Sequence, residues 1–95
     1  MKAIVIGLGS MGKRRVRNLI ANGVTDITGL DPREDRRKET EDKYSIKTIE
    51  AISEASDLEG YDVALISTPP DLHMYYAYMT YEFKIQISKN LYSIY

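Results

Sequence analysis

The strongest constraint on the fold of this chain is a glycine-rich corner near its N-terminus, between an apolar run and a helical pattern. Residues Lys2 to Gly7 form a short apolar run rich in β-branched side chains, which is typical of a parallel strand buried on both faces. From Ser10 to about Asn22, apolar and small residues recur at helical spacing. Gly7, Gly9 and Gly12 join these segments in the pattern G-x-G-x-x-G. Such a pattern is informative only in this context, after a strand and at the start of a helix.

The rest of the chain continues the alternation of strand and helix. The stripe of the first helix that is predicted to face the core consists of Gly12, Val16, Leu19, Ile20 and Gly23. Further strands are predicted at 25–30, 45–48, 62–67 and 85–88, with helices at 33–43 and 71–83 and a short helix or turn at 49–56. Strands that alternate with helices form parallel sheets with right-handed crossovers. The predicted fold class is therefore α/β, a doubly wound parallel sheet of the Rossmann type with strand order 3-2-1-4-5.

The glycine corner is predicted to bind a phosphate group. In this setting Gly7 permits a tight turn, Gly9 lets the backbone approach a pyrophosphate, and Gly12 lets the helix pack against the strand. The helix start offers unpaired N–H groups and the positive end of the helix dipole. Its first turn contains cations and no acid, an arrangement that a bound anion would stabilise. A solvated basic face is the alternative interpretation for Lys13, Arg14 and Arg17.

A carboxylate follows the second predicted strand. Asp31 lies close to the interval of about 20 residues after the glycines at which an acid accepts hydrogen bonds from an adenosine ribose. Because its charge repels a 2′-phosphate, the sequence favours NAD(H) over NADP(H) as the cofactor. Arg33, Arg36 and Arg37 weaken that preference, so NADP remains an alternative. Asp31 is also open to interpretation as a turn residue before Pro32.

Composition excludes several other classes of protein. The chain has 95 residues, enough for one domain, and a net charge of -1, which argues against a dedicated nucleic-acid binder. It has no cysteine and a single histidine, His73, so we expect neither thiolate chemistry nor a metal site. No apolar run approaches the roughly 18 residues of a membrane span, and we expect a cytoplasmic protein without membrane contact.

Three stretches together resemble one known family. They are V-I-G-L-G-S-M-G-K-R-R at 5–15, G-L-D at 29–31 and I-S-T-P-P-D-L-H at 66–73. They are similar to the N-terminal domain of the glucose–fructose oxidoreductase and inositol dehydrogenase family (Gfo/Idh/MocA), and the resemblance covers about residues 2–79. It implies a Rossmann domain that binds NAD or NADP, a second domain that binds a sugar, polyol or related substrate, and hydride transfer at a carbinol carbon.

The resemblance also implies particular site residues. Gly7, Leu8, Gly9, Ser10, Met11 and Gly12 match the pyrophosphate loop, Asp31 matches the ribose acid, and Thr68, Pro69 and His73 match the segment that borders the cofactor. We add Arg33 and Ser67, their sequence neighbours, to the predicted cofactor-binding set. Two alternatives remain open: the prolines after Thr68 also suit the first turn of a helix, and His73 also suits a packed helix residue.

The resemblance fades in the last part of the chain, 80–95. The family shows Glu-Lys-Pro after its fifth strand, where this chain has Ser88, Lys89 and Asn90, so the resemblance makes Lys89 the candidate catalytic residue. The chain is expected to be a truncated domain that binds NAD(H) but does not transfer hydride alone, since no substrate domain follows. A tyrosine-rich C-terminal helix, or an edge strand, suggests a homodimer. The alternative function is a non-catalytic Rossmann module for assembly or nucleotide sensing.

Overall fold

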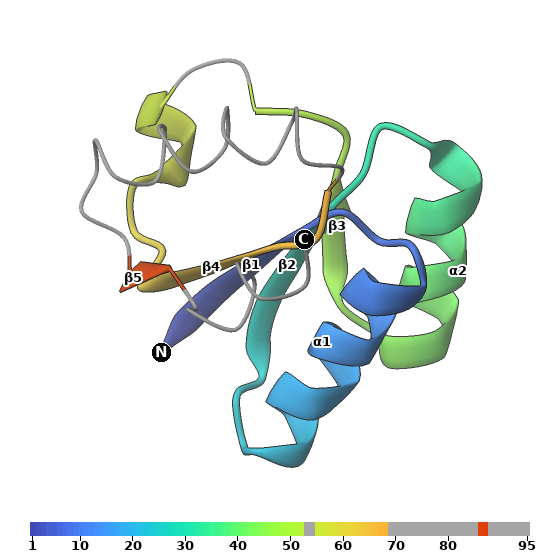
Figure 1. Ribbon diagram of the computed structural model, residues 1–95, viewed down its shortest axis with the longest axis horizontal. Coiled ribbons are helices and arrows are strands. Elements are labelled where there is room, and N and C mark those ends of the chain that lie inside the picture. Colours follow the sequence, from blue (N-terminus) through green and yellow to red (C-terminus); the bar gives the residue numbers. More distant parts are fainter. Residues whose placement is uncertain (53–54, 69–85, 88–95) are drawn as a thin grey trace.

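The computed structural model describes residues 1–52, 55–68 and 86–87 of the chain (Figure 1). In chain order the described elements are β1 (Lys2–Ile6), α1 (Ser10–Ala21), β2 (Asp26–Leu30), α2 (Glu34–Tyr44), β3 (Lys47–Ile49), the 3₁₀ helix η1 (Ala55–Leu58), β4 (Val63–Ile66) and β5 (Gln86–Ile87). The helix predicted at 71–83 lies outside the described residues.

The strands form one parallel sheet whose order is β3-β2-β1-β4-β5. The register places Val5 of β1 beside Gly29 of β2 on one side and beside Leu65 of β4 on the other. β1 is thus the central strand, and the chain reverses its direction of travel across the sheet between β3 and β4. The doubly wound α/β fold and the strand order predicted from the sequence are confirmed.

The centre of the sheet is buried because both of its faces are covered. Residues Ala3, Ile4, Val5 and Ile6 have no exposed surface. α1 and α2 lie side by side against one face, and η1 lies on the opposite side (Figure 1). Leu58 of η1 is fully buried and belongs to the same hydrophobic cluster as β1. A strand covered on both sides must be apolar at consecutive positions, which explains why Lys2–Ile6 shows no alternation of polar and apolar residues.

α1 ends in a Schellman motif. Gly23 adopts φ +86°, and its N–H donates to the Ile20 carbonyl at 3.0 Å. The N–H of Val24 donates to the Leu19 carbonyl at 2.9 Å. These two hydrogen bonds satisfy carbonyl groups that would otherwise have no partner at the helix end. Gly23 therefore stops the helix, as the sequence predicts.

One residue of the predicted α1 stripe does not face the core. Gly12 and Val16 are buried and Leu19 is partly buried, but Ile20 is 38% exposed. Eight residues after Gly12, Ile20 lies about 80° around the helix axis, at the margin of the buried stripe. Its assignment to the core was wrong, because the sheet covers a narrower sector of α1 than the apolar pattern indicates.

The third strand begins later than predicted. The sequence prediction was 45–48, whereas β3 is Lys47–Ile49. Ser45 is the C-cap of α2 and adopts a left-handed conformation, φ 57° and ψ 41°, with its N–H donating to the Glu41 carbonyl at 2.9 Å. A residue in that conformation completes the helix end and cannot belong to a strand.

The short helix or turn predicted at 49–56 was also misplaced. Ile49 is the last residue of β3 and pairs with Leu30 of β2. The helical turn is η1 at Ala55–Leu58. Pairing with a neighbouring strand, which a local pattern does not reveal, keeps Ile49 extended.

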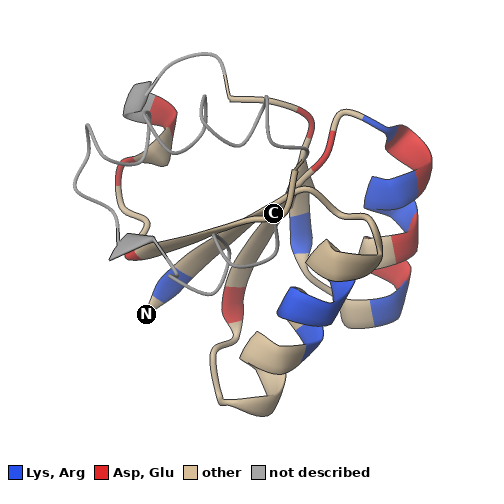
Figure 2. Ribbon diagram, viewed as in Figure 1, with Lys and Arg blue, Asp and Glu red and all other residues tan. Residues whose placement is uncertain are grey.

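The two helices differ in charge. α1 contains Lys13, Arg14, Arg15 and Arg17 and no acid, whereas α2 mixes both signs along its length (Figure 2). Lys13 Nζ lies 3.3 Å from Glu39 Oε2 and links the two helices. Among the described residues, no helix has both the length and the apolar character needed to cross a membrane.

Candidate functional site

Two glycines of the corner are required by the packing of the folded chain. Gly7 adopts φ +95°, and a Cβ atom there would lie 2.8 Å from the carbonyl oxygen of Ser67 in the neighbouring strand end. A Cβ atom on Gly12 would lie 1.7 Å from the Gly7 carbonyl oxygen. No side chain fits at either position without movement of the backbone. These two glycines make the turn after β1 and the close contact between α1 and that turn.

Gly9 differs from its two neighbours in the motif. Its φ of -71° and ψ of -164° are open to any residue. The nearest atoms to a Cβ at this position would be the guanidinium group of Arg36, with Cζ and Nη1 at 3.7 Å. That distance is ordinary van der Waals contact with a flexible side chain. The folded chain on its own therefore has room for a methyl group at Gly9.

The strand ends around the corner are held together by backbone hydrogen bonds. The N–H of Gly7 donates to the last carbonyl of β2 at 2.7 Å, and the N–H of Ser67 donates to the last carbonyl of β1 at 2.7 Å. The N–H of Asp31 donates to the last carbonyl of β3 at 3.2 Å. The residues that follow β1, β2 and β4 thus lie with the end of β3 at one edge of the sheet, beside the start of α1.

The N-terminus of α1 has no capping side chain and no acid in its first turn. Its N-cap is Gly9, whose carbonyl accepts the first hydrogen bond of the helix, from the N–H of Lys13 at 2.9 Å. The N–H groups of residues 10–12 precede that bond and have no acceptor within the helix. α2, by contrast, has acidic side chains in its first turn, which offset the helix dipole. The start of α1 therefore suits an anion supplied from outside the chain.

Asp31 is a buried carboxylate that ties the glycine corner to the start of α2. It is 3% exposed, and its Oδ2 accepts the N–H of Leu8 at 2.9 Å while its Oδ1 accepts the N–H of Arg33 at 2.9 Å. The second contact is an Asx turn, which confirms the interpretation of Asp31 as a turn residue before Pro32. A carboxylate has about four acceptor sites, so Asp31 retains capacity for a hydroxyl group of a ligand.

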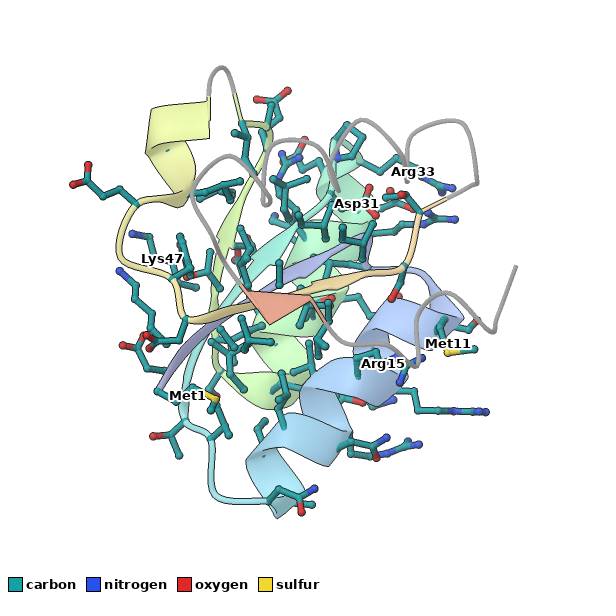
Figure 3. All side chains as sticks on the ribbon, turned by 60° about the vertical axis from the view of Figure 1, so that its left-hand side comes forward. Met1, Met11, Arg15, Asp31, Arg33 and Lys47 are labelled. Carbon is teal, nitrogen blue, oxygen red and sulfur yellow. The ribbon has the colours of Figure 1, made fainter. Side chains whose placement is uncertain are left out.

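Arg33 lies beside Asp31 beyond the end of β2 (Figure 3), but its charged group is directed to Asp35. Its Nε and Nη2 donate to the Asp35 carboxylate at 3.1 and 2.7 Å. These hydrogen bonds, reinforced by the opposite charges, lower the pKa of the Asp35 carboxyl and raise that of the Arg33 guanidinium. The hydrogen bond from Arg33 to Asp31 comes from its backbone N–H.

Leu8 anchors the loop, a role that sequence reasoning missed. Its side chain is fully buried, and a Cβ atom on Gly29 would lie 3.0 Å from both of its δ-methyl carbons. Gly29 is thus the residue of β2 that makes space for Leu8. An isolated glycine within a strand pattern is the signal that could have indicated this close approach.

Two buried hydroxyl groups after β4 have no hydrogen-bond partner among the described residues. Ser67 Oγ and Thr68 Oγ1 are buried, and neither has a hydrogen bond to any part of the chain that the structure describes. Thr68 is 8% exposed, and its Cγ2 would lie 3.2 Å from a Cβ on Gly7. Buried hydroxyls normally have a partner, so these two are available to a ligand at the corner. The predicted site residues Pro69, His73 and Lys89 lie outside the described residues.

These features define a class of protein. A parallel sheet has its order reversal at β1 and β4, and a glycine turn, an open helix N-terminus and a buried acid lie at the carboxyl edge of that sheet. This is the arrangement of a dinucleotide-binding Rossmann domain.

The comparison with protein families identifies the particular family. The model of the Gfo/Idh/MocA family, described as "Oxidoreductase family, NAD-binding Rossmann fold", matches residues 1–87. The chain belongs to this family and is its NAD-binding Rossmann domain. The resemblance drawn from the sequence is confirmed, and the match runs past residue 79, where the recognisable motifs end.

Two solved structures share the fold, and a curated relative matches in sequence. An oxidoreductase from Agrobacterium radiobacter, solved in complex with NAD+, L-tartaric acid and magnesium, superimposes with a TM-score of 0.80 at 20% identity, over 92% of this chain and 26% of that one. A probable dehydrogenase from Thermotoga maritima gives a TM-score of 0.75 at 23% identity with the same coverage. A glutamyl-tRNA reductase from Staphylococcus aureus (strain JH9) is 33% identical over 67 residues, 70% of this chain and 15% of the reductase. The chain thus spans a small part of each relative.

Proposed function

We propose that the glycine corner holds the pyrophosphate and adenosine ribose of NAD(H), and that the chain supplies the cofactor half of a hydride-transfer enzyme. The observation that carries the proposal is the contrast between Gly9 and its two neighbours. Packing requires glycine at Gly7 and Gly12, but the folded chain alone has room for a methyl group at Gly9. A glycine at that position is explained if a ligand's phosphate, rather than a protein atom, occupies the space beside the backbone.

The residues around Gly9 suit the parts of a dinucleotide. The N–H groups of Ser10 and Met11, at the uncapped start of α1, would donate to the pyrophosphate oxygens. Asp31 would accept a ribose hydroxyl with its remaining lone pairs. The unpartnered hydroxyls of Ser67 and Thr68 would donate to the ligand from the β4 side. Pro69 and His73, adjacent in sequence to this edge, complete the proposed contacts with the cofactor.

The bound nicotinamide would accept or donate the hydride, and the chain's own residues would hold and orient it. Lys89 is the catalytic candidate that the family pattern suggests, and it follows the residues that the family model matches. The substrate, a sugar, polyol or related alcohol, is proposed for the whole enzyme, because the chain spans 26% of its solved neighbours. Residues 1–95 are proposed as one domain.

Two further properties belong to the same proposal. We place the protein in the cytoplasm, because its proposed cofactor is drawn from the cell's nucleotide pool. We also propose a homodimer through the C-terminal segment, where six of the eight tyrosines follow residue 74. Tyrosine is enriched at protein interfaces, and light scattering of the full chain would test the dimer.

The variant Gly9→Ala tests the proposed cofactor site. It should weaken NADH binding, measured by calorimetric titration, at least about tenfold, since a methyl group would displace the phosphate. Its free energy of unfolding should fall by no more than about 1 kcal/mol, the usual effect of alanine at an N-cap.

Gly23→Ala is the matched control at the other end of α1. A residue with φ +86° is strained with any side chain, so this variant should lose about 1–2 kcal/mol of stability. Its affinity for NADH should be that of the parent chain. If Gly9→Ala binds NADH as tightly as the parent, the pyrophosphate does not lie over Gly9 and the proposal is wrong.

A further inference from the structure

Asn22 and Gly23, at the C-terminal end of α1, form the one Asn-Gly pair of the sequence. Asparagine is a thermolabile residue, and it reacts most readily before glycine, which has no side chain to hinder the approach of its own backbone nitrogen. The reaction is deamidation, in which that nitrogen attacks the side-chain carbonyl carbon of the asparagine, Cγ. Both residues are exposed, so water reaches them. Whether the reaction occurs therefore depends on the backbone geometry of this helix end.

The folded helix end keeps the attacking nitrogen away from its target. The reaction closes a five-membered ring, in which the Gly23 nitrogen and the Cβ of Asn22 lie on the same side of the Cα–C bond. Asn22 has a φ of -96° and a ψ of 13°. A ψ near zero places the Gly23 nitrogen beside the nitrogen of Asn22 itself, and so away from its Cβ. The ring closes only after a large rotation about ψ of Asn22.

Hydrogen bonds hold both reacting groups in this unreactive arrangement. The N–H of Gly23 donates to the Ile20 carbonyl at 3.0 Å, which engages the proton that the nitrogen must lose before it attacks. The leaving group is held as well, because Nδ2 of Asn22 donates to the Asn18 carbonyl at 2.7 Å. Both bonds have to break before the amide is released.

The Schellman motif that closes this end of the helix is fixed by few buried contacts. The N–H of Val24 donates to the Leu19 carbonyl at 2.9 Å. The side chains of Leu19 and Val24 are only partly buried where they pack against the hydrophobic core. A helix end of this kind opens at a lower free energy than the whole fold. Opening breaks the bond from the Gly23 N–H and frees ψ of Asn22 together, because both belong to the motif.

We propose that Asn22 is a deamidation site controlled by the Schellman motif, which protects the residue when closed and releases it on local opening. In the open state the Gly23 nitrogen gives its proton to hydroxide and forms a bond to Cγ of Asn22. The Cγ–Nδ2 bond then breaks, and Nδ2 takes a proton from water and leaves as ammonia. One water molecule opens the ring at either carbonyl, which gives aspartate or isoaspartate. The product carries a permanent negative charge at the C-cap of α1.

The test compares the rate of deamidation in the folded and unfolded chain. The full chain is incubated at mildly alkaline pH with and without urea, and peptide mass spectrometry follows the conversion of Asn22. The folded chain should react between about 10- and 1,000-fold more slowly than the unfolded chain, because local opening requires less free energy than global unfolding. Asn18, which Leu19 follows, is the internal control and should not convert over the same interval.

Val24→Ala loosens the motif and leaves Asn22 and Gly23 in place. When folded, this variant should deamidate about 3- to 10-fold faster than the parent chain, and when unfolded at the parent rate. Ile4→Val is the matched control for global stability, because Ile4 is fully buried in β1. Its rate when folded should equal that of the parent, since the opening is local. Urea unfolding establishes that both variants are folded and measures how much stability each has lost.

Several results would overturn the proposal. A folded chain less than about tenfold slower than the unfolded chain shows that the motif does not protect Asn22. A folded chain more than about 1,000-fold slower shows that opening of the helix end does not reach the reactive geometry. An unchanged rate in Val24→Ala, or an equal acceleration in Ile4→Val, shows that the reaction does not follow local opening of this motif.

Discussion

Asp31 should contribute to stability as well as to cofactor binding, and the two roles are separable. In the folded chain its buried carboxylate accepts the N–H of Leu8 and the N–H of Arg33, both at 2.9 Å. The variant Asp31→Ala removes both acceptors at once. The glycine corner and the start of α2 then lose the group that joins them.

The size of the effect follows from the two N–H groups left behind. A buried donor without a partner destabilises the fold by about 1–3 kcal/mol. The bond to Leu8 is buried and the bond to Arg33 is partly buried, so the sum should lie near about 2–4 kcal/mol. We add nothing for Arg36, because an ion pair at 3.6 Å with a partly exposed partner has little net effect.

Asp31→Asn separates the two roles. Its remaining oxygen can accept the N–H of Leu8, so it should lose only about 1–2 kcal/mol of stability. It has fewer acceptor sites for the ribose, and its NADH dissociation constant should rise about tenfold. Urea unfolding measures the first quantity, and calorimetric titration of the folded variant measures the second.

Asp26→Ala is the control for the loss of an acid, because Asp26 is the first residue of β2 and Asp31 follows the last one. Asp26 is exposed at the start of β2, and its removal should change the free energy of unfolding by less than about 0.5 kcal/mol. If Asp31→Ala is also within about 0.5 kcal/mol of the parent chain, the carboxylate does not hold the loop and the reasoning fails.

Two further predictions concern the backbone turn and the surface. Gly12→Ala should lose at least about 3 kcal/mol of stability, because its methyl group would lie 1.7 Å from the Gly7 carbonyl oxygen. Thermal unfolding measures this loss. A loss as small as that of Gly9→Ala would contradict the packing of Gly12 against Gly7. Arg33 lowers the pKa of the Asp35 carboxyl in the folded chain. The pair therefore stabilises the fold fully above the pKa of the unfolded carboxyl, about 3.9. That stabilisation disappears as the pH falls through the lower pKa of the folded chain. Between about pH 5 and pH 2, the parent chain should therefore lose slightly more stability than Asp35→Asn in urea titrations, and parallel pH profiles would contradict the assignment.

The elements nearest the glycine motif were the most predictable from sequence. β1 and α1 have strong signals: a run of β-branched residues, a helical stripe and a terminal glycine. β3 was predicted two residues early, because the left-handed conformation of Ser45 is a property of the folded helix end. Where a local pattern is weak, the partner strand decides the boundary, as it does for Ile49.

The residues of the candidate site also form two groups, those that the sequence indicated and those that only the structure shows. The glycines and Asp31 were found by residue type and spacing, since turns and ribose recognition need those residues at those intervals. The anchoring of the loop by Leu8 against Gly29 and the separate tasks of the arginines were not found. Those features depend on which side chains meet across the sheet, and sequence distance does not report that.

The sequence by itself determined the doubly wound class of fold and the place of the glycine turn between β1 and α1. Both follow from local periodicity and from the backbone freedom of glycine, which act within a few residues. Only the tertiary structure decided that Arg36, rather than Arg33 or Arg37, lies over Asp31 and Gly9. All three arginines are close to Asp31 in sequence, but the turn of α2 and the packing of strand ends direct their guanidinium groups to different partners.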